Sequence, residues 1–201
     1  MVPLEPEYYY HIYNHAVSKN NLFYSDENYS FFLKKYHYHI NPVADTFVYC
    51  LMPNHFHLFV QIKTADEIET LRSGNNSSNQ NGISIENFVS KQFSNLFSSY
   101  TQALNKQRYR MGTLFMKPFK RKLISTDDYV KKLIHYIHYN PVHHGYTNDL
   151  LSWKFCSYES FFSEKESRLK RQRVINWFGD LENFKSFHQG DIDEQLTSDL
   201  E

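Results

Sequence analysis

The run 53–60 (PNHFHLFV) most constrains the fold, because it sets two histidines one residue apart in a segment that is typical of a β-strand. Side chains two positions apart point to the same face of a strand, so His55 and His57 stand side by side while Phe56 and Leu58 face the other way. Neutral imidazole is the commonest protein ligand for a divalent metal ion, and a rigid strand presets two corners of a coordination shell. With 11 histidines in 201 residues, an exposed polar strand face is the alternative interpretation.

A second element, 129–140 (YVKKLIHYIHYN), carries its apolar residues at helical spacing. Pro141 disfavours helical geometry for the residue before it, which places Asn140 in the last turn. Tyr136 and Asn140 are four residues apart and therefore share one face of this helix. The helix thus sets a phenol beside an amide oxygen, a hard ligand that suits Mg²⁺ or Mn²⁺.

Other histidines and tyrosines in this region offer alternatives. Tyr139 points away from Asn140 on the same helix, and most helical tyrosines are packing residues. Four further histidines could in principle bind zinc, but their spacing matches no standard zinc module: His135, His138, His143 and His144. Capping or surface roles are the simpler interpretation of these four.

Charge is distributed unevenly along a chain whose net charge is zero. Between Asn87 and Thr126 there is no acidic residue, whereas acidic residues cluster towards the end of the chain. Such a basic segment favours binding to phosphates, and Tyr109, Phe115 and Phe119 within it could stack on unpaired bases. An ordinary solvated basic surface is the alternative. The candidate DNA-binding residues, of which Lys120 and Arg121 are the first candidates for phosphate contacts, are Lys106, Arg108, Arg110, Lys117, Lys120, Arg121 and Lys122.

The remaining pattern predicts an α+β fold, in which helices pack on one face of an antiparallel sheet. Strands are expected at 9–17, 47–52, 55–62 and 117–125, and helices at 26–41, 85–105 and 129–140. The Asn-, Ser- and Gly-rich stretch at about 72–84 is expected to be a flexible loop. We expect one domain over residues 1–160 and an aromatic-rich extension over 161–201, with an acidic, disordered tail.

Composition excludes several classes of protein. The chain has no run of about 18 apolar residues, so no membrane span is expected, and Glu5 and Glu7 stand where a secretion signal needs positive charge. A cytoplasmic location is therefore expected. Cys50 and Cys156 form no CxxC unit and are expected to be packed thiols in a reducing compartment.

Taken together, these motifs resemble the HUH single-strand endonucleases of the IS200-like (Y1) tyrosine transposases, in particular the branch associated with repetitive extragenic palindromes (REPs). The matching runs are 53–57 (PNHFH) and 136–142 (YIHYNPV), followed by Gly145, with weaker similarity at 10–14 (YHIYN), 112–115 (GTLF) and 152–158 (SWKFCSY). The resemblance covers roughly residues 8–160 in family order.

The resemblance implies a ferredoxin-like HUH fold and assigns roles by position. His55 and His57 match the metal-binding pair, Tyr136 the nucleophile, and Asn140 the third metal ligand. Many insertion-sequence relatives carry a glutamine at this last position, so Asn140 is a departure that fits the palindrome-associated branch. The implied cofactor is Mg²⁺ or Mn²⁺, the implied partners are single-stranded DNA hairpins or palindromic repeats, and the implied state is a monomer or homodimer.

Three functions follow as hypotheses. The first is a metal-dependent transposase that binds a DNA hairpin, cleaves one strand through a 5′-phosphotyrosine intermediate and rejoins it. A phenol has an ordinary pKa of about 10, so about one in a thousand is ionised at neutral pH and the nucleophile needs activation. The second is a domesticated protein that binds palindromic hairpins without cutting them. The third, a replication-initiation or relaxase-type nuclease, is ranked lowest because residues 161–201 are too short for an accessory helicase.

Overall fold

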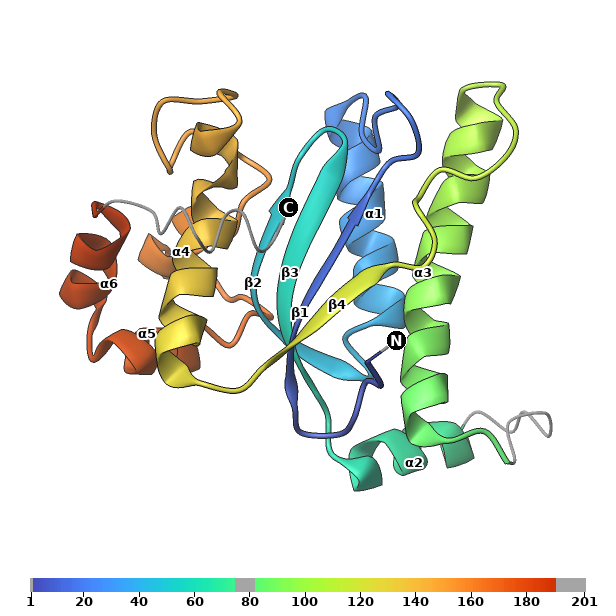
Figure 1. Ribbon diagram of the computed structural model, residues 1–201, viewed down its shortest axis with the longest axis horizontal. Coiled ribbons are helices and arrows are strands. Elements are labelled where there is room, and N and C mark those ends of the chain that lie inside the picture. The colour runs from blue at the N-terminus through green and yellow to red at the C-terminus, as the bar shows by residue number, and fades with distance from the viewer. Residues whose placement is uncertain (1, 75–81, 191–201) are drawn as a thin grey trace.

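The computed structural model describes residues 2–74 and 82–190, and Figure 1 shows a four-stranded sheet between two groups of helices. None of the helices in these two ranges is both long and apolar enough to cross a bilayer. In chain order the elements are β1 Tyr9–His15, α1 Asp26–His39, β2 Ala44–Leu51, β3 His55–Ile62, α2 Ala65–Gly74, α3 Ile85–Gln107, β4 Lys120–Ile124, α4 Asp127–His143, the 3₁₀ helix η2 Tyr158–Phe162, α5 Arg171–Phe178 and α6 Leu181–His188. The predicted α+β class is confirmed.

The sheet has the order β2-β3-β1-β4, with every neighbouring pair antiparallel. Strand β3 occupies the predicted residues and pairs with both β1 and β2. A tight turn joins β2 to β3, where the Met52 backbone N–H donates to the His55 carbonyl at 2.8 Å. The two histidines of β3 therefore begin a central strand whose register is set on both sides.

Helices cover both faces of the sheet, whereas one covered face was expected. Helices α1 and α3 bury the face that includes Phe56 and Leu58, and α4 with α5 and α6 buries the opposite face, which includes Phe59 (Figure 1). Nearly every side chain of β3 is buried. Both faces of β3 are therefore buried, and α4 covers the face that carries His55 and His57.

Helix α4 begins at Asp127 and continues past the proline that was expected to end it. Pro141 lies in the last turn, where it removes one i→i−4 hydrogen bond but little helix remains to be disrupted, and the helix ends at His143. Gly145 follows with a φ of +69°, a left-handed conformation that glycine adopts without strain. Asn140 thus lies in the last turn, as predicted.

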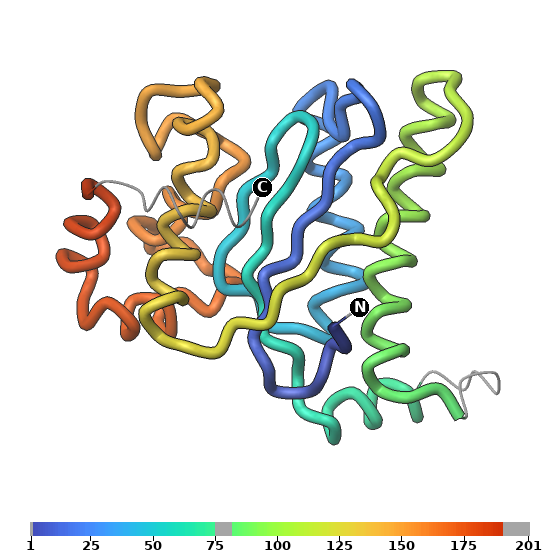
Figure 2. Tube along the Cα trace, in the orientation of Figure 1, coloured from blue at the N-terminus to red at the C-terminus, as the bar shows by residue number. Residues whose placement is uncertain are grey.

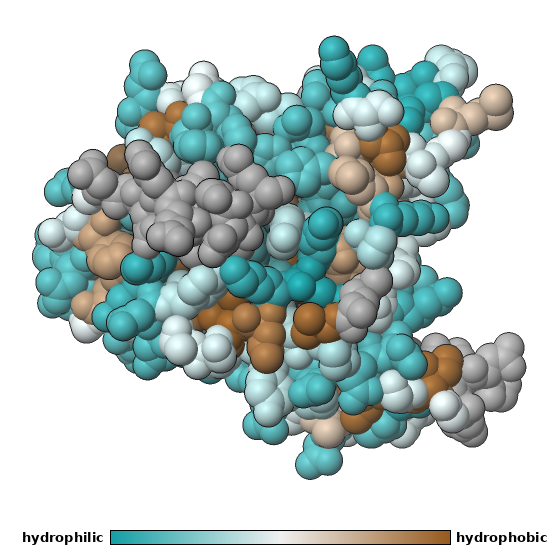
Figure 3. All heavy atoms as spheres, in the orientation of Figure 1, coloured by the Kyte–Doolittle hydropathy of each residue, from teal (hydrophilic) through white to brown (hydrophobic). Residues whose placement is uncertain are grey.

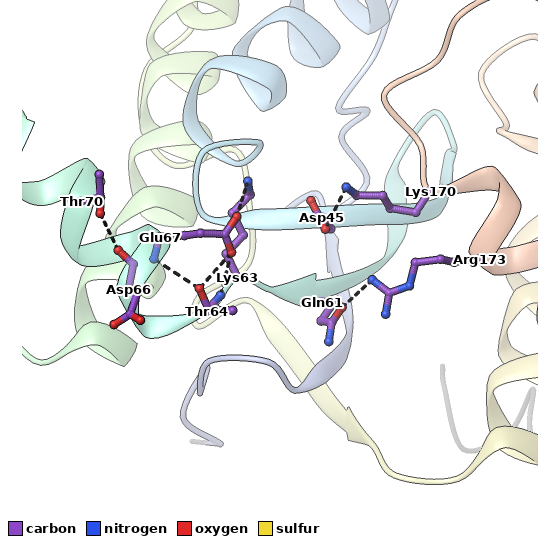
Figure 4. A network of polar contacts seen from close by, with 9 residues as sticks. All are labelled: Asp45, Gln61, Lys63, Thr64, Asp66, Glu67, Thr70, Lys170 and Arg173. Carbon is purple, nitrogen blue, oxygen red and sulfur yellow. Dashed lines mark hydrogen bonds and ion pairs between the residues drawn. The ribbon is translucent and has the colours of Figure 1, made fainter.

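The chain beyond α4 returns to run beside the outer edge of β2 (Figure 2). The Leu51 N–H donates to the Phe155 carbonyl at 3.0 Å and the Ser157 N–H donates to the Tyr49 carbonyl at 2.9 Å. Two further contacts hold α5 against the sheet (Figure 4): Lys170 pairs with Asp45 at 3.1 Å and Arg173 donates to Gln61 at 3.0 Å. Residues 161–190 therefore pack against β2 and α4.

The loop expected at about 72–84 is only partly described. Residues 72–74 lie in helix α2, which corrects that part of the expectation, and residues 75–81 lie outside the described ranges. Thr64 caps α2 through a reciprocal pair of hydrogen bonds with Glu67, visible in Figure 4, and this cap explains why the helix forms. The expected acidic tail beyond residue 190 is likewise outside the described residues.

A buried chain of histidine hydrogen bonds fastens α6 to α4. His188 Nδ1 donates to the Phe184 carbonyl at 2.8 Å, so its Nε2 accepts from His138 Nδ1 at 2.9 Å. His138 Nε2 then accepts from the Ser157 hydroxyl at 2.9 Å. The two contacts in which Nε2 accepts require neutral imidazoles, and burial lowers the pKa of His188 to about 3 and that of His138 well below its usual range.

Stability is expected to fall as pH falls from about 6.5 towards about 3. Below the ordinary histidine pKa, His188 binds a proton in the unfolded chain but stays neutral in the folded protein. The free energy of unfolding therefore decreases, by roughly 2 kcal/mol at pH 5 for this group alone. Urea unfolding at pH 7, 6 and 5 measures the slope. In His188→Gln an amide oxygen still accepts from His138, and the slope between pH 6 and 5 should be shallower by about 1.2 kcal/mol per pH unit. An unchanged slope would contradict this assignment.

Candidate functional site

The candidate site lies between β3 and α4, on the sheet face that includes His55 and His57. We call this the His face. On β1 the residues paired with the two histidines are His15 and Tyr13, and because antiparallel partners share a face, both belong to it. His55 and His57 are 4% and 2% exposed. The strand alternation expected from the sequence is therefore present, on a face that a helix covers.

Helix α4 brings the phenol and the amide to these histidines. The Tyr136 ring stands perpendicular to the His57 ring, with centroids 5.3 Å apart, and Asn140 Oδ1 lies 3.3 Å from His55 Nε2. Tyr136 is only 3% exposed, so its ring is packed between helix and sheet. The two pairs of residues that the sequence singled out thus meet in space.

The orientation of the Asn140 amide is fixed by its other end. Asn140 Nδ2 donates to the Tyr136 carbonyl at 2.8 Å, which leaves Oδ1 to face His55. On the opposite edge of the His55 ring, Nδ1 lies 2.8 Å from Asn54 Oδ1. The imidazole therefore stands between two amide oxygens, both of which are acceptors.

This arrangement fits a bound cation. Burial lowers the pKa of His55 to about 3, so at neutral pH the ring carries one N–H and cannot donate to both oxygens. With the proton on Nδ1 towards Asn54, the Nε2 lone pair faces Asn140 Oδ1. Two acceptors 3.3 Å apart match neighbouring ligands of an octahedral ion, which lie about 3 Å apart at metal–ligand distances of about 2.1 Å.

The second candidate ligand, His57, is also held in the neutral form. Burial, followed by the neighbouring His11 and His55, holds the pKa of His57 well below its usual range. Its Nδ1 lies 2.9 Å from His11 Nε2. Metal binding needs neutral imidazole, and both candidate ligands are held in that form.

Asn140 decides whether the site has enough protein ligands to hold a metal ion. Across residues 2–74 and 82–190, no three side chains of the His, Cys, Asp and Glu types are grouped so that they could hold a metal ion. A cation between His55 and His57 thus depends on the amide oxygen as its third protein ligand. The alternative zinc interpretation gains no support in these ranges, since His135 and His138 belong to the buried contacts around His188.

The sheet register separates the candidate DNA-binding residues. Lys120 pairs with Tyr13 and Lys122 with His11, so both lysines lie on the His face, whereas Arg121 points to the other face and donates to Ser90 at 3.2 Å. Figure 3 shows hydrophilic side chains over β4 on the visible side of the molecule. Of the first candidates for phosphate contacts, Lys120 shares a surface with the site and Arg121 does not.

The other basic residues surround the loop after α3. Arg110 braces this loop, because its guanidinium donates to Asn105 at 2.9 Å and to the Thr113 carbonyl at 3.2 Å. Arg108 lies 3.9 Å from the centre of the Tyr24 ring. Lys106 and Lys117 are exposed.

Of the three aromatic rings expected to stack on bases, Tyr109 alone is accessible. It is 99% exposed, and Met111 beside it is 93% exposed, whereas Phe115 and Phe119 are core residues at 4% and 8%. The tip of the loop after α3 is therefore a braced, basic turn that presents one ring and one thioether to solvent.

Sequence reasoning missed three residues of the site. His11 contacts His57, Asn54 contacts His55, and the His15 ring stacks on His55 at 4.8 Å. The sequence does contain a signal for His11 and His15, because they are four residues apart on β1 and therefore point to the same face of that strand. Only the register of β1 against β3 shows that this face is the one that carries His55 and His57. The His144 ring also approaches His55, at 4.9 Å.

Comparisons with known proteins agree with the sequence motifs. No family model matches the chain. The chain is 27% identical over 116 residues to a curated Haemophilus influenzae protein named "Putative REP-associated tyrosine transposase". The match covers 57% of this chain and 58% of that protein, so the chain spans less than two thirds of that relative's length.

A solved structure gives the fold. A REP-associated tyrosine transposase bound to a REP hairpin superimposes with a TM-score of 0.58 at 14% identity, over 82% of this chain and 84% of that one. The predicted fold class is thereby confirmed, and the curated relative and this structure together confirm the resemblance to the palindrome-associated transposases.

Proposed function

We propose that this protein is a metal-dependent transposase-type endonuclease that binds single-stranded DNA hairpins, cuts one strand and rejoins it. The observation that carries the proposal is the meeting of Tyr136 and Asn140 with His55 and His57 on one buried face. The relatives named as REP-associated tyrosine transposases, one of them bound to a REP hairpin, support the same substrate class.

Tyr136 is the proposed nucleophile. Its phenolic oxygen attacks the scissile phosphorus, a tyrosine–phosphate bond forms at the 5′ side, and the P–O3′ bond breaks to release a 3′-hydroxyl. Phenoxide is a better leaving group than alkoxide, so a free 3′-hydroxyl can attack the same phosphorus and restore the tyrosine. Since the Tyr136 ring is 3% exposed, attack requires it to rotate out of its packed position against His57.

His55, His57 and Asn140 would hold the divalent cation, Mg²⁺ or Mn²⁺. When bound, it supplies positive charge that polarises the phosphate and stabilises the charge that develops during the displacement. The three side chains themselves orient the site: the two imidazoles are fixed by the sheet, and the amide is fixed by its hydrogen bond to the Tyr136 carbonyl.

The DNA surface divides into two parts. Lys120 and Lys122 extend the His face across β4 and would neutralise the phosphates nearest to the cut. The tip at Tyr109 and Met111, together with Arg108, offers a ring, a thioether and a cation to unpaired bases of a hairpin.

Positive charge on the His face is expected to contribute more to hairpin affinity than positive charge on the opposite face of the sheet. Lys120→Ala combined with Lys122→Ala should weaken hairpin binding about 10-fold or more at physiological salt and reduce the slope of log Kd against log salt by about 1 to 2. Arg121→Ala is the matched control, since it removes one cation from the same strand but from the α3 side. Fluorescence anisotropy over a salt series measures both; a control that weakens binding as much as the double variant would refute the division by face.

The proposed function is tested with an end-labelled REP-type hairpin that carries single-stranded flanks, incubated with the protein and Mn²⁺. A covalent protein–DNA adduct that survives denaturation is expected with Mn²⁺ and absent with chelator. The alternative, a protein that binds palindromic hairpins without cutting them, predicts a different result: equal hairpin affinity with and without chelator, and no adduct with any divalent ion.

A further inference from the structure

His11 is a buried imidazole of the His face, and among the described residues its side chain makes one hydrogen bond, to a proposed metal ligand. It is 0% exposed, its Nε2 lies 2.9 Å from His57 Nδ1, and its ring stacks on Tyr13 with centroids 4.7 Å apart. Its own Nδ1 has no hydrogen-bond partner among the described residues. A phenylalanine would fill the same buried position without leaving a polar atom unsatisfied, so packing does not explain the imidazole.

Both proposed metal ligands are held through the same ring nitrogen. His55 Nδ1 contacts Asn54 Oδ1 at 2.8 Å, and His57 Nδ1 contacts His11 Nε2 at 2.9 Å. In each ring this leaves Nε2 as the atom that can bind a cation, and His55 Nε2 indeed faces Asn140 Oδ1. Asn54 and His11 thus occupy equivalent positions behind the two ligands.

The contact between His57 and His11 holds one proton, and the position of that proton decides whether His57 can bind metal. If the proton sits on His57 Nδ1, the Nε2 lone pair of His57 is available. If it sits on His11 Nε2, neutral His57 carries its own proton on Nε2 and cannot bind a cation there. An acceptor at residue 11 is therefore what selects the metal-binding tautomer.

We propose that His11 is a positioning residue that accepts the Nδ1 proton of His57 and so holds His57 in the tautomer that binds a divalent cation through Nε2. The inference rests on the proposed cation site and adds a residue to it. Partners of this kind orient metal-bound histidines, and their loss typically weakens metal binding by about 10- to 100-fold.

Cation affinity tests the proposal without any measurement of cleavage. Titrating Mn²⁺ into the DNA-free protein, followed by electron paramagnetic resonance, should show about 10- to 100-fold weaker binding for His11→Phe than for wild type. His11→Gln places an amide oxygen where Nε2 was and should recover most of the affinity. Tyr13→Phe is the matched control: it keeps the ring that stacks on His11 and should bind as wild type.

A spectroscopic measurement on the wild-type protein covers the case in which His11→Phe does not fold. With Mg²⁺ bound, imidazole ¹⁵N NMR should place the shared proton on His57 Nδ1, with a coupling across the hydrogen bond to His11 Nε2. A proton on His11 Nε2 under these conditions overturns the proposal, and so does a folded His11→Phe that binds Mn²⁺ as tightly as wild type. Wild-type protein that binds no cation would instead overturn the proposed metal site itself, and this inference with it.

Discussion

Tyr136→Phe is expected to abolish the covalent adduct with labelled hairpin DNA, by a factor on the order of 10³ or more, while the Kd for the hairpin stays within about twofold of wild type. Phenylalanine keeps the ring that packs perpendicular to His57 and removes only the oxygen that would attack phosphorus. Adduct formation is followed on denaturing gels, and hairpin affinity by fluorescence anisotropy.

Tyr139→Phe is the matched control, because it makes the same chemical change one turn further along α4. The Tyr139 ring packs near His135, with centroids 5.7 Å apart, and not on the His face. It should form adduct at the wild-type rate. An adduct that persisted in Tyr136→Phe and vanished in Tyr139→Phe would transfer the nucleophile to the other tyrosine.

The site could be predicted as far as local periodicity reaches. A period of two on β3 puts His55 and His57 on one face, and a spacing of four on α4 does the same for Tyr136 and Asn140. Neither period says which face of the sheet the helix covers. The expectation of one covered face failed at this point, since both faces of β3 are buried and only the positions of all the helices show that α4 lies over the histidines.

Residues supplied by pairing between distant segments were harder to predict. His11 reaches His57 across 46 positions of sequence through the register of β1 against β3. The same register separates Lys120 and Lys122 from Arg121, a division that alternation along β4 could have given once that strand was placed. Burial of Phe115 and Phe119 had no local signal, because the loop that carries them is basic and Gly-containing.

The short helices were also hard to predict from the sequence. Helix α2 overlaps a stretch whose composition favours a loop, and its capping pair of Thr64 and Glu67 is visible in the sequence only once a helix is suspected. Helices α5 and α6 have eight residues each and take their stability from packing on α4, including the contact of His188 with His138. Such helices depend on tertiary contacts that composition alone does not indicate.

Asn140→Ala is expected to lower Mn²⁺ affinity and the rate of adduct formation by more than about 100-fold, a larger loss than that of a residue behind a ligand. The structure groups no other third ligand of the His, Cys, Asp or Glu type with His55 and His57 in the ranges it describes, so the amide oxygen has no substitute there. The variant also loses the hydrogen bond to the Tyr136 carbonyl. Thermal unfolding in chelator separates this structural loss from the loss of metal.

Asn140→Asp is expected to change Mn²⁺ affinity in the opposite direction to Asn140→Ala. A carboxylate keeps an oxygen towards His55 and adds a negative charge, so Mn²⁺ should bind more tightly than to wild type. Its second oxygen would then face the Tyr136 carbonyl where Nδ2 now donates, which costs roughly 1–3 kcal/mol of stability in chelator. The melting temperature of this variant should therefore start below that of wild type and rise further on addition of Mn²⁺. Equal Mn²⁺ shifts in the alanine, aspartate and wild-type proteins would show that no cation binds at Asn140.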